Sequence, residues 1–483
     1  MAETLILSGA PEGLDAALIA READRGAAAN RPVIHVARDD RRMAAMRAAL
    51  AFFAPQLPVL ELPAWDTTPY DRVSPSGEIM AQRLQVLAAL ATGAIRAPFV
   101  LLTTVNAAVQ RLPAAETVRA ASFIAKKGER LDEGQLRGFL ARMGFSQSPT
   151  VTEPGDYAIR GGIIDIYPPG PGGPVRLYLF GDVLDGIRRF DPDSQRSLGA
   201  LDSVEIAPMS EVILDEASIT RFRQNYRAEY GGGAHDPLYE AVSAGQKLAG
   251  MEHWLPWFHD RLDSIFAYLP GASVVLDDHA EQHRAARWDT ITEQHDARRE
   301  ALAKRGADNV YRPVAPAAMF ADAEEWARWL DSHRVIRLSV LAQPPGPGVL
   351  DAGGRVGRNF APERQAEKTD LFGALAAHIR ELQKTRRVVV ASFSEGARER
   401  LSGLLSDEGL AGTPIDDIRG LPDRKGALGL AVWPLEEGFV WDGQAAGQLA
   451  VISEQDVLGD RLIRGAKKRR RAENFLKDTT SLT

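Results

Sequence analysis

Residues 8–15 have the spacing of a phosphate-binding loop without its charges. In a Walker A loop, G-x-x-x-x-G-K-[ST], backbone amides cradle the phosphates, the lysine reaches the outer phosphates and the hydroxyl group holds magnesium. The frame here includes Gly9 and Gly13, but Leu14 occupies the lysine position and Asp15 the hydroxyl position. The positive charge is missing, and a carboxylate stands where an anion would bind. An ordinary strand-turn-helix start predicts the same residues, so a degenerate P-loop needs support from elsewhere in the chain.

A second acidic segment follows an apolar strand much later in the chain. The stretch GASVVLDDH contains Asp277 and Asp278, and carboxylates at the end of such a strand hold magnesium in Walker B segments. Any α/β strand can end in an acidic loop. The two segments together nevertheless predict a nucleotide-binding fold in which the Walker A half of the site has lost its essential residues. The degenerate nucleotide site would comprise Gly9, Gly13, Leu14, Asp15, Asp277 and Asp278.

The histidines offer a weaker metal-binding pattern. His279 and His283 stand four residues apart, so on one helix they could share a metal with His295. The segment HAEQH does not match HExxH and no fourth ligand is evident, which favours a solvated polar helix and no metal site. His253 and His259 lie beside large aromatic residues and are interpreted as packing or surface histidines. The sequence has no G-x-S-x-G elbow, and we expect no catalytic residue in this chain.

A strand at residues 174–180, PVRLYLF, carries a different kind of candidate site. Its side chains alternate between two faces, and the apolar alternate residues predict the core side. Arg176, Tyr178 and Phe180 then face solvent, and Arg160 could join them because it precedes a glycine pair that permits close backbone approach. Arginine and aromatic residues are concentrated as anchors in protein interfaces. An exposed aromatic on a half-solvated sheet is nevertheless common, so these residues alone do not favour an interface.

The elements that must position these residues form several domains, because 483 residues exceed the roughly 250–300 at which one hydrophobic core stops growing. Near the N-terminus, apolar strands such as FVLLTTV alternate with helical patterns, which predicts a parallel sheet covered on both faces. A small antiparallel insert follows, in which Gly181-Asp182 forms a two-residue connection of type II′. The expected segments are 1–121 and 207–335 for the first α/β domain, 122–206 for the insert, 336–368 for a linker, 369–458 for a small α/β domain and 459–483 for a basic polar tail.

Composition narrows the function classes. The net charge of −7 argues against a protein that wraps DNA through a dominantly basic surface, although the cluster Lys467–Arg471 could touch phosphates or form a solvated helix. With no cysteine, the chain has no disulfide, no thiolate chemistry and no Cys-type zinc or iron–sulfur site. No apolar run approaches the roughly 18 residues of a membrane helix. We expect a soluble cytoplasmic protein.

Several segments resemble one family in their order along the chain. They are LPAWDTTPYDRVSPSGEIMAQRL, LLTTVNAAVQRLP, DYAIRGGIIDIYPPG, PVRLYLFGDVLDGIRRFDPDSQRS, MEHWLPWFHDRLDSIFAYLP with VVLDDH, and LAVISEQDVLGDR. The resemblance is to the N-terminal part of bacterial transcription-repair coupling factors, which is itself similar to the excision-repair protein UvrB. It implies a multidomain α/β fold: a UvrB-like, degenerate P-loop NTPase-type parallel-sheet domain, interrupted by a small antiparallel α+β insert and followed by a small α/β domain.

The resemblance also separates this chain from UvrB. In UvrB the nucleotide segments are intact, whereas the coupling factors have lost the Walker lysine, and Leu14 matches that loss. Without the charge that balances the phosphates, we expect no ATP hydrolysis and no cofactor. UvrB carries a tyrosine-rich hairpin that grips damaged DNA, and the corresponding region here offers only Trp65 and Tyr70.

The function implied by the resemblance lies in the insert. The family binds UvrA, the damage-recognition subunit of the excision nuclease, through residues that match Arg160, Arg176 and Phe180. This favours the interface interpretation. The arginine guanidinium groups would bind carboxylates of the partner, and Phe180 would fill an apolar pocket. The expected function is a non-catalytic adapter that recruits UvrA for transcription-coupled nucleotide excision repair. The alternatives are an active nucleotide hydrolase with an atypical loop and a UvrB-like module that binds damaged DNA.

The full family protein contains further parts that the resemblance does not find in this sequence. They are an RNA polymerase-binding domain, a helicase-like translocase that uses ATP and magnesium to move on double-stranded DNA, and a C-terminal domain that masks the UvrA-binding surface. We therefore expect this chain to be a piece of a longer protein, with its UvrA-binding surface unmasked.

Overall fold

The computed structural model of the chain describes residues 4–170, 172–231, 236–305, 311–366, 370–443 and 448–459. These residues divide into two compact units between Arg355 and Val356, with Asp417–Arg419 grouped with the first unit. Within the described residues, no helix is long and apolar enough to cross a membrane.

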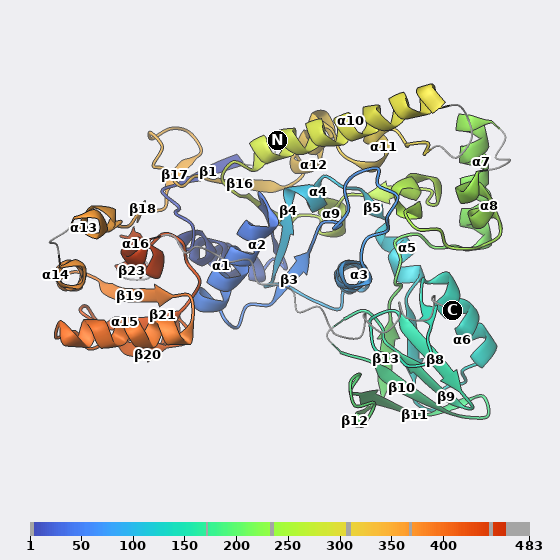
Figure 1. The fold of residues 1–483 in the computed structure, drawn as a ribbon, viewed down its shortest axis with the longest axis horizontal. Helices are drawn as coiled ribbons and strands as arrows, with labels where there is room; N and C mark the ends of the chain where they lie inside the picture. Colours follow the sequence, from blue (N-terminus) through green and yellow to red (C-terminus); the bar gives the residue numbers. More distant parts are fainter. Residues whose placement is uncertain are drawn as a thin grey trace, which may run out of the picture. The chain divides into compact units, whose positions relative to one another are not determined.

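The first unit is built on a parallel sheet of seven strands in the order β17-β1-β16-β15-β2-β4-β3 (Figure 1). Every neighbouring pair in this sheet is parallel. β2 and β4 are buried at every residue, as their apolar sequences predict. The strands are β1 Thr4–Ser8, β2 Val33–Ala37, β3 Val59–Leu62, β4 Val100–Thr104, β15 Ser273–Leu276, β16 Arg334–Leu338 and β17 Val349–Asp351.

Helices cover this sheet and extend beyond it. Many begin at a side-chain cap, for example Asp39 at α2 and Ser76 at α3, which each accept a hydrogen bond from a first-turn amide. The helices of the first unit outside the insert are α1 Leu14–Ala27, α2 Asp40–Phe53, α3 Gly77–Thr92, α4 Val105–Ala108, α5 Ala115–Ala120, α7 Glu216–Tyr230, α8 Pro237–Ser243, the 3-10 helix η1 Met251–Trp257, α9 Ile265–Tyr268, α10 Ala280–Arg305, α11 Pro316–Met319 and α12 Ala323–Leu330. Two short strands, β5 Leu112–Pro113 and β14 Leu262–Asp263, pair with each other.

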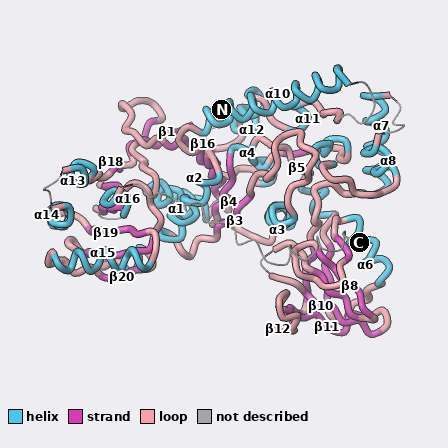
Figure 2. Tube along the Cα trace, viewed as in Figure 1, coloured by secondary structure: helices cyan, strands magenta, loops and turns pink. Residues whose placement is uncertain are grey.

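The insert is built on a six-stranded sheet in the order β12-β11-β10-β9-β8-β7, antiparallel except between β7 and β8. Figure 2 shows strands β8, β10, β11 and β12 of this sheet close together. Leu136 and Leu140 of α6, Glu133–Arg142, are buried in the same apolar core as one face of this sheet. The strands are β7 Ser146–Gln147, β8 Asp156–Arg160, β9 Ile163–Ile166, β10 Val175–Phe180, β11 Val183–Phe190 and β12 Ser197–Leu201. A separate pair, β6 Phe123–Lys126 and β13 Ser203–Ile206, joins the beginning of the insert to its end.

The predicted type II′ hairpin in the insert agrees with the backbone. Phe180 pairs directly with Val183, so the connection has two residues. Gly181 has a φ of 64° and Asp182 is not among the residues with positive φ, which is the type II′ pattern of signs.

The predicted linker at 336–368 is wrong for much of its length. It contains the end of β16, the whole of β17, strand β18 (Gly354–Val356) and helix α13 (Ala361–Gln365). The Pro- and Gly-rich stretch 343–348 is a loop between two strands of one sheet, so the first domain continues past residue 335 to β17. A loop within a domain and a linker between domains use the same residue types, so the composition of this stretch does not distinguish the two.

The second unit is the expected small α/β domain. Its sheet has the order β18-β22-β23-β19-β21-β20, in which β22 runs antiparallel to β23 and the pairs made by β19 are parallel. Its elements are α14 Leu371–Gln383, β19 Arg387–Ser392, α15 Glu395–Asp407, β20 Thr413–Ile415, β21 Leu428–Val432, β22 Phe439–Trp441, β23 Leu449–Ser453 and α16 Glu454–Leu458. The 3-10 helix η2, Ile418–Gly420, follows β20 in the chain, and two of its three residues are grouped with the first unit. The predicted basic tail with its cluster Lys467–Arg471 lies outside the described residues, apart from Gly459.

Candidate functional site

The carboxyl ends of three parallel strands bring the P-loop remnant together. Parallel strands end at one edge of their sheet, and the loops after β1, β2 and β15 meet there. These loops, together with the first turns of α1 and α2, supply residues 9–15, Arg38 with Arg42, and Asp277. The sequence predicted the first and third of these segments, but not the two arginines. The signal for them was the run RDDRR directly after the buried strand β2.

The arginines pair with the carboxylates in an ion cluster, which consists of Glu12, Asp15, Arg38, Arg42 and Asp277. Arg42 contacts Asp15 and donates from Nε to Asp277 Oδ1 at 3.2 Å. Arg38 donates to Glu12 Oε1 at 2.6 Å and to Asp277 Oδ2 at 3.2 Å. The side chains of Arg42, Asp15 and Asp277 are at most 2% exposed. The guanidinium groups thus lie inside the loop frame and are neutralised by the protein's own carboxylates.

The ion cluster contains three carboxylates and two guanidinium groups, so one negative charge is in excess. Burial raises the pKa of Asp15 to about 7, against the opposing effect of Arg42, with Asp277 and Glu12 adding to the rise. His35 on β2 supplies no third positive charge, because burial and the nearby Arg42 lower its pKa to about 3. The cluster is therefore balanced when Asp15 holds a proton.

The backbone amides that a phosphate would need are already bonded inside the protein. The amide of Gly9 donates to the Leu341 carbonyl at 3.4 Å, and that of Gly13 donates to Asp15 Oδ1 at 3.0 Å. The amides of Leu14 and Asp15 both donate to the Pro11 carbonyl, at 3.1 and 3.2 Å. A phosphate would have to displace these acceptors and approach the carboxylate of Asp15.

A covering segment, residues 352–354, which leads from β17 into β18, closes over the same frame. The Gly354 amide donates to the Gly9 carbonyl at 2.9 Å, and a Cβ atom on Gly354 would lie 2.2 Å from Leu14 Cδ2. Leu14 itself is fully buried. Asp278 points elsewhere, since its Oδ2 accepts from the Val340 amide at 3.3 Å. Of the six residues predicted for the degenerate nucleotide site, five meet around the loop and Asp278 is engaged by the chain after β16.

The second candidate region is the outer face of the insert sheet, opposite its apolar core. Strand register aligns Arg160, Ile163 and Tyr178 in one row, and Asp165, Arg176 and Arg188 in the next. Directly paired residues point to the same face of a sheet, and Phe180 follows Tyr178 by two residues on β10. The three residues predicted to bind a partner, Arg160, Arg176 and Phe180, therefore share one face. Phe180 is 83% exposed, as predicted.

The prediction that Arg176 is free toward solvent is wrong. Asp165 accepts from its Nε and Nη2 at 2.6 and 2.9 Å, and the guanidinium carbon lies 4.8 Å from the ring centroid of Phe190. Its Nη1 also donates to the Gln195 carbonyl at 3.4 Å. The alternation of β10 gave the correct face, but Asp165 comes from the neighbouring strand and could be found only from the register.

Arg160 is exposed and donates to the Pro149 carbonyl. It borders an open groove of about 540 Å³ with residues 147–149 and Ala158. The glycine pair after it does not lie inside a strand as expected. Arg160 pairs with Ile163, and Gly161 and Gly162 have φ values of 50° and 72°, so they form the tight turn between β8 and β9.

The metal-binding spacing proposed for the histidines is not realised. His279 precedes α10 with a φ of 64°, outside the helix that carries His283 and His295. Twelve helical residues separate those two, which corresponds to about 18 Å. The part of the chain that the structure describes contains no group of three His, Asp or Glu residues suited to a metal. His253 and His259 are buried, as the packing interpretation predicts.

The only two aromatic residues found in the sequence region that corresponds to the UvrB hairpin, Trp65 and Tyr70, are inside the protein. Trp65 is 9% exposed and packs edge-on against His253, with ring centroids 5.7 Å apart. Tyr70 is 1% exposed and lies against His295, with ring centroids 5.5 Å apart. In this conformation neither ring is available to stack on a base.

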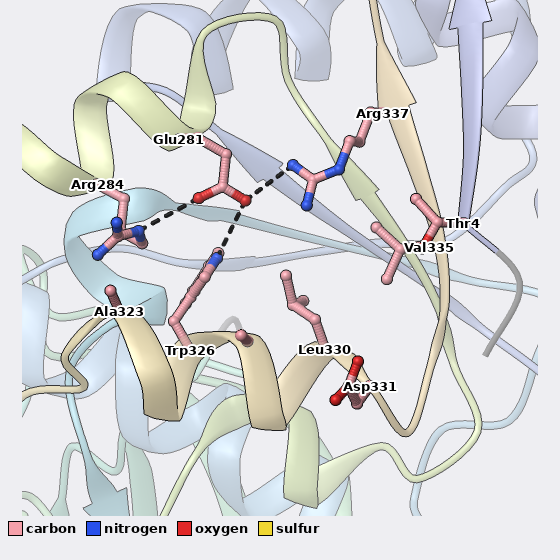
Figure 3. A pocket seen from close by; sticks show the side chains of 10 residues that line it. Thr4, Glu281, Arg284, Ala323, Trp326, Leu330, Asp331, Val335 and Arg337 are labelled. Carbon is pink, nitrogen blue, oxygen red and sulfur yellow. Dashed lines mark hydrogen bonds and ion pairs between the residues drawn. The ribbon is translucent and has the colours of Figure 1, made fainter. Parts of the chain in front are cut away.

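A small pocket of about 190 Å³ lies between α10, α12 and β16 (Figure 3). Its polar group Glu281 accepts from Arg337 at 2.8 Å, Arg284 at 3.2 Å and the indole of Trp326 at 3.4 Å. The carboxylate is satisfied by groups of the pocket itself, and none of the residues predicted from the sequence to form a site lines it.

Comparisons with known proteins agree with this architecture. Residues 124–212 match the UvrB interaction domain and residues 382–457 match the MFD, D3 domain. The transcription-repair-coupling factor of Escherichia coli (strain K12) is 31% identical over 464 residues, covering 95% of this chain and 38% of that protein. The corresponding factor of Haemophilus influenzae is 29% identical over 85% of this chain and 35% of its own length, and that of Myxococcus xanthus is 31% identical over 92% and 38%.

The fold and these matches define a multidomain α/β chain, in which a region that matches the UvrB interaction domain interrupts a parallel-sheet domain and a region that matches the MFD, D3 domain follows. Its relatives are similar to it along most of its sequence. The chain belongs to the transcription-repair-coupling factor family, and it spans somewhat more than a third of the length of these relatives.

Proposed function

We propose that this chain is a non-catalytic adapter that recruits UvrA through the outer face of its insert. The observation that carries the proposal is the exposure of Phe180, 83% exposed beside a tight hairpin, on the same face as Arg160 and Arg176. A large aromatic side chain exposed to this extent is poorly stabilised in an isolated domain and suits a hot-spot position in an interface. The match of residues 124–212 to the UvrB interaction domain supports a protein-binding role for this region.

The non-catalytic part of the proposal rests on the P-loop remnant. A carboxylate stands at the position of the hydroxyl group, and the arginines near it pair with the protein's own carboxylates. The amides of the loop already donate to acceptors within the protein. The site thus lacks the donors and the net positive charge that phosphoryl transfer needs. A hydrolase with an atypical loop has no support in this arrangement, and buried Trp65 and Tyr70 weigh against the DNA-binding alternative.

The proposal also concerns the whole protein, whose further partners would bind parts that lie outside this chain. They are stalled RNA polymerase and double-stranded DNA, together with ATP and magnesium in helicase-like motor domains and a C-terminal domain that masks the UvrA-binding face. A cytoplasmic location follows from these proposed partners.

Calorimetric titration of the chain with UvrA tests the adapter function. Phe180→Ala is expected to weaken binding by about 10- to 100-fold, the range of an interface hot spot, without lowering the melting temperature. Val73→Ala is the matched control, because Val73 is 56% exposed and belongs to the other part of the first unit. An unchanged affinity for Phe180→Ala, or no binding by the wild-type chain, would refute the proposal. Titration with ATP in the presence of magnesium is expected to give no binding heat.

A further inference from the structure

Besides Arg176, the outer face of the insert contains Arg188, whose charge is not neutralised by any residue that the structure describes. Arg188 on β11 pairs directly with Arg176 on β10, which in turn pairs with Asp165 on β9. Side chains at directly paired positions stand about 5 Å apart at Cβ. One carboxylate and two guanidinium groups thus lie in a row across three strands.

Asp165 is committed to Arg176. Both of its oxygens accept from that guanidinium, at 2.6 and 2.9 Å, in the fork geometry that makes such pairs strong. Asp165 is 3% exposed and the side chain of Arg176 is 16% exposed, so this pair is largely shielded from solvent. Arg176 therefore has little capacity left for a carboxylate from outside.

Arg188 differs from Arg176 in its exposure and in its contacts. It is exposed, and its side chain has no hydrogen bond or ion pair with the described residues of the chain. It stands beside the like charge of Arg176, an arrangement that is unfavourable in the isolated sheet and improves when a carboxylate approaches. The net charge of this row is positive, and Arg188 is its accessible end.

The surface between Arg188 and Phe180 extends along β10 and β11. Tyr178 lies between them on β10, with its ring 3.8 Å from the position of a Cβ on Gly186 and its hydroxyl 3.3 Å from Ser197 Oγ. Arg176 and Phe180 are four residues apart on one strand, which corresponds to about 13 Å. The face thus presents a free guanidinium, a flat aromatic ring and an exposed phenyl group in sequence.

We propose that Arg188 is a direct contact for a carboxylate of UvrA, and that Arg176 is a positioning residue that Asp165 holds in place beneath it. The inference rests on the proposed recruitment of UvrA and adds the chemistry of the partner: an acidic side chain that pairs with Arg188 and an apolar pocket that receives Phe180. A protein partner suits this face better than a nucleic acid, because the exposed carboxylates of Asp182 and Asp185 on the same hairpin would oppose a chain of phosphates.

The test compares Arg188→Glu with Arg189→Glu in calorimetric titrations with UvrA. The two substitutions change the charge equally at adjacent exposed residues, but Arg189 pairs with Val175, a core-side residue, and so points to the other face. Arg188→Glu is expected to weaken binding at least tenfold and to reduce its dependence on salt, with an unchanged melting temperature. Arg189→Glu is expected to change affinity less than threefold.

Other outcomes distinguish this inference from the function on which it rests. If both variants weakened UvrA binding equally, the effect would come only from the long-range electrostatic field of the domain. This result would overturn the role of Arg188 as a direct contact. Unchanged affinity for Arg188→Glu, with weakening by Phe180→Ala, would overturn the inference and leave the adapter function standing. Absence of binding by the wild type would overturn both, and a preference of the face for duplex DNA over UvrA would replace the protein partner.

Arg176→Met tests the positioning role. It leaves the carboxylate of Asp165 without its partner, so the melting temperature of the chain is expected to fall together with its affinity for UvrA. A loss of affinity with an unchanged melting temperature would make Arg176 the direct contact and contradict the assignment.

Discussion

Replacing Asp15 with asparagine tests whether the ion cluster in the P-loop frame holds a proton near neutral pH. Asp15 is 2% exposed, and the cluster has one more carboxylate than it has guanidinium groups. Asparagine has the shape of aspartate without its charge. Its effect on stability should therefore depend on whether Asp15 is ionised in the wild-type protein at the pH of the measurement.

The sign and size follow from the pKa of Asp15, which burial raises from 3.8 to about 7 in the folded chain. Between these values the folded state binds more protons than the unfolded state, so the contribution of Asp15 to the free energy of unfolding falls as pH rises. It is complete below about pH 4 and lost above about pH 7. The full difference corresponds to at most about 4 kcal/mol. Asp15→Asn is thus expected to be within about 1 kcal/mol of the wild type near pH 4.5 and to exceed its stability by up to about 4 kcal/mol at pH 8.

Urea denaturation followed by tryptophan fluorescence at pH 4.5, 6, 7 and 8 measures this difference. The exposed residue Asp24 on α1 provides the control, because Asp24→Asn removes the same charge from the same helix outside the ion cluster. An Asp15→Asn variant that is less stable than the wild type at pH 8 would refute the reasoning. So would a difference between the two proteins that stays constant from pH 4.5 to pH 8.

Three further outcomes are expected. Leu14→Lys should not restore nucleotide binding, measured with a fluorescent ATP analogue, because the loop amides remain bonded to internal acceptors; measurable binding would contradict this. Arg83→Met should lower the free energy of unfolding by about 3 to 5 kcal/mol, since Arg83 and Glu211 form a fully buried pair at 2.6 Å and the carboxylate would be left alone; Glu211→Gln in the same chain should recover part of the loss. Gly354→Ala should destabilise the chain by about 1 to 3 kcal/mol, because its Cβ would lie 2.2 Å from Leu14 Cδ2, whereas Gly403→Ala in the open surface of α15 should be neutral or stabilising in the same melting experiment.

The sequence predicted those features that depend on local pattern. The fully buried strand β4 was predicted from its apolar run, and the hairpin at Gly181 from the need for a positive φ in a two-residue turn. The outer face of β10 followed from the period of two along a strand. In each case the physical cause acts within a few residues of the pattern.

What the sequence could not predict depends on pairing between distant segments. Arg42 and Asp277 are 235 positions apart and meet only because β2 and β15 are neighbours in the sheet. Asp165 neutralises Arg176 because the register of β9 and β10 places them opposite each other. The strand β17 follows a proline- and glycine-rich loop whose composition predicts a linker, and only its pairing with β1 shows that it belongs to the sheet.

The pairing of β6 with β13 has a consequence for the history of this architecture. Phe123 near the start of the insert lies opposite Ile206 near its end, so the excursion leaves the parallel-sheet domain and returns to it through neighbouring positions. A segment with adjacent ends can be gained, lost or exchanged in one genetic event while the surrounding sheet keeps its strand order. The same property would allow the insert to be excised with its closing strand pair and carried on an unrelated host protein.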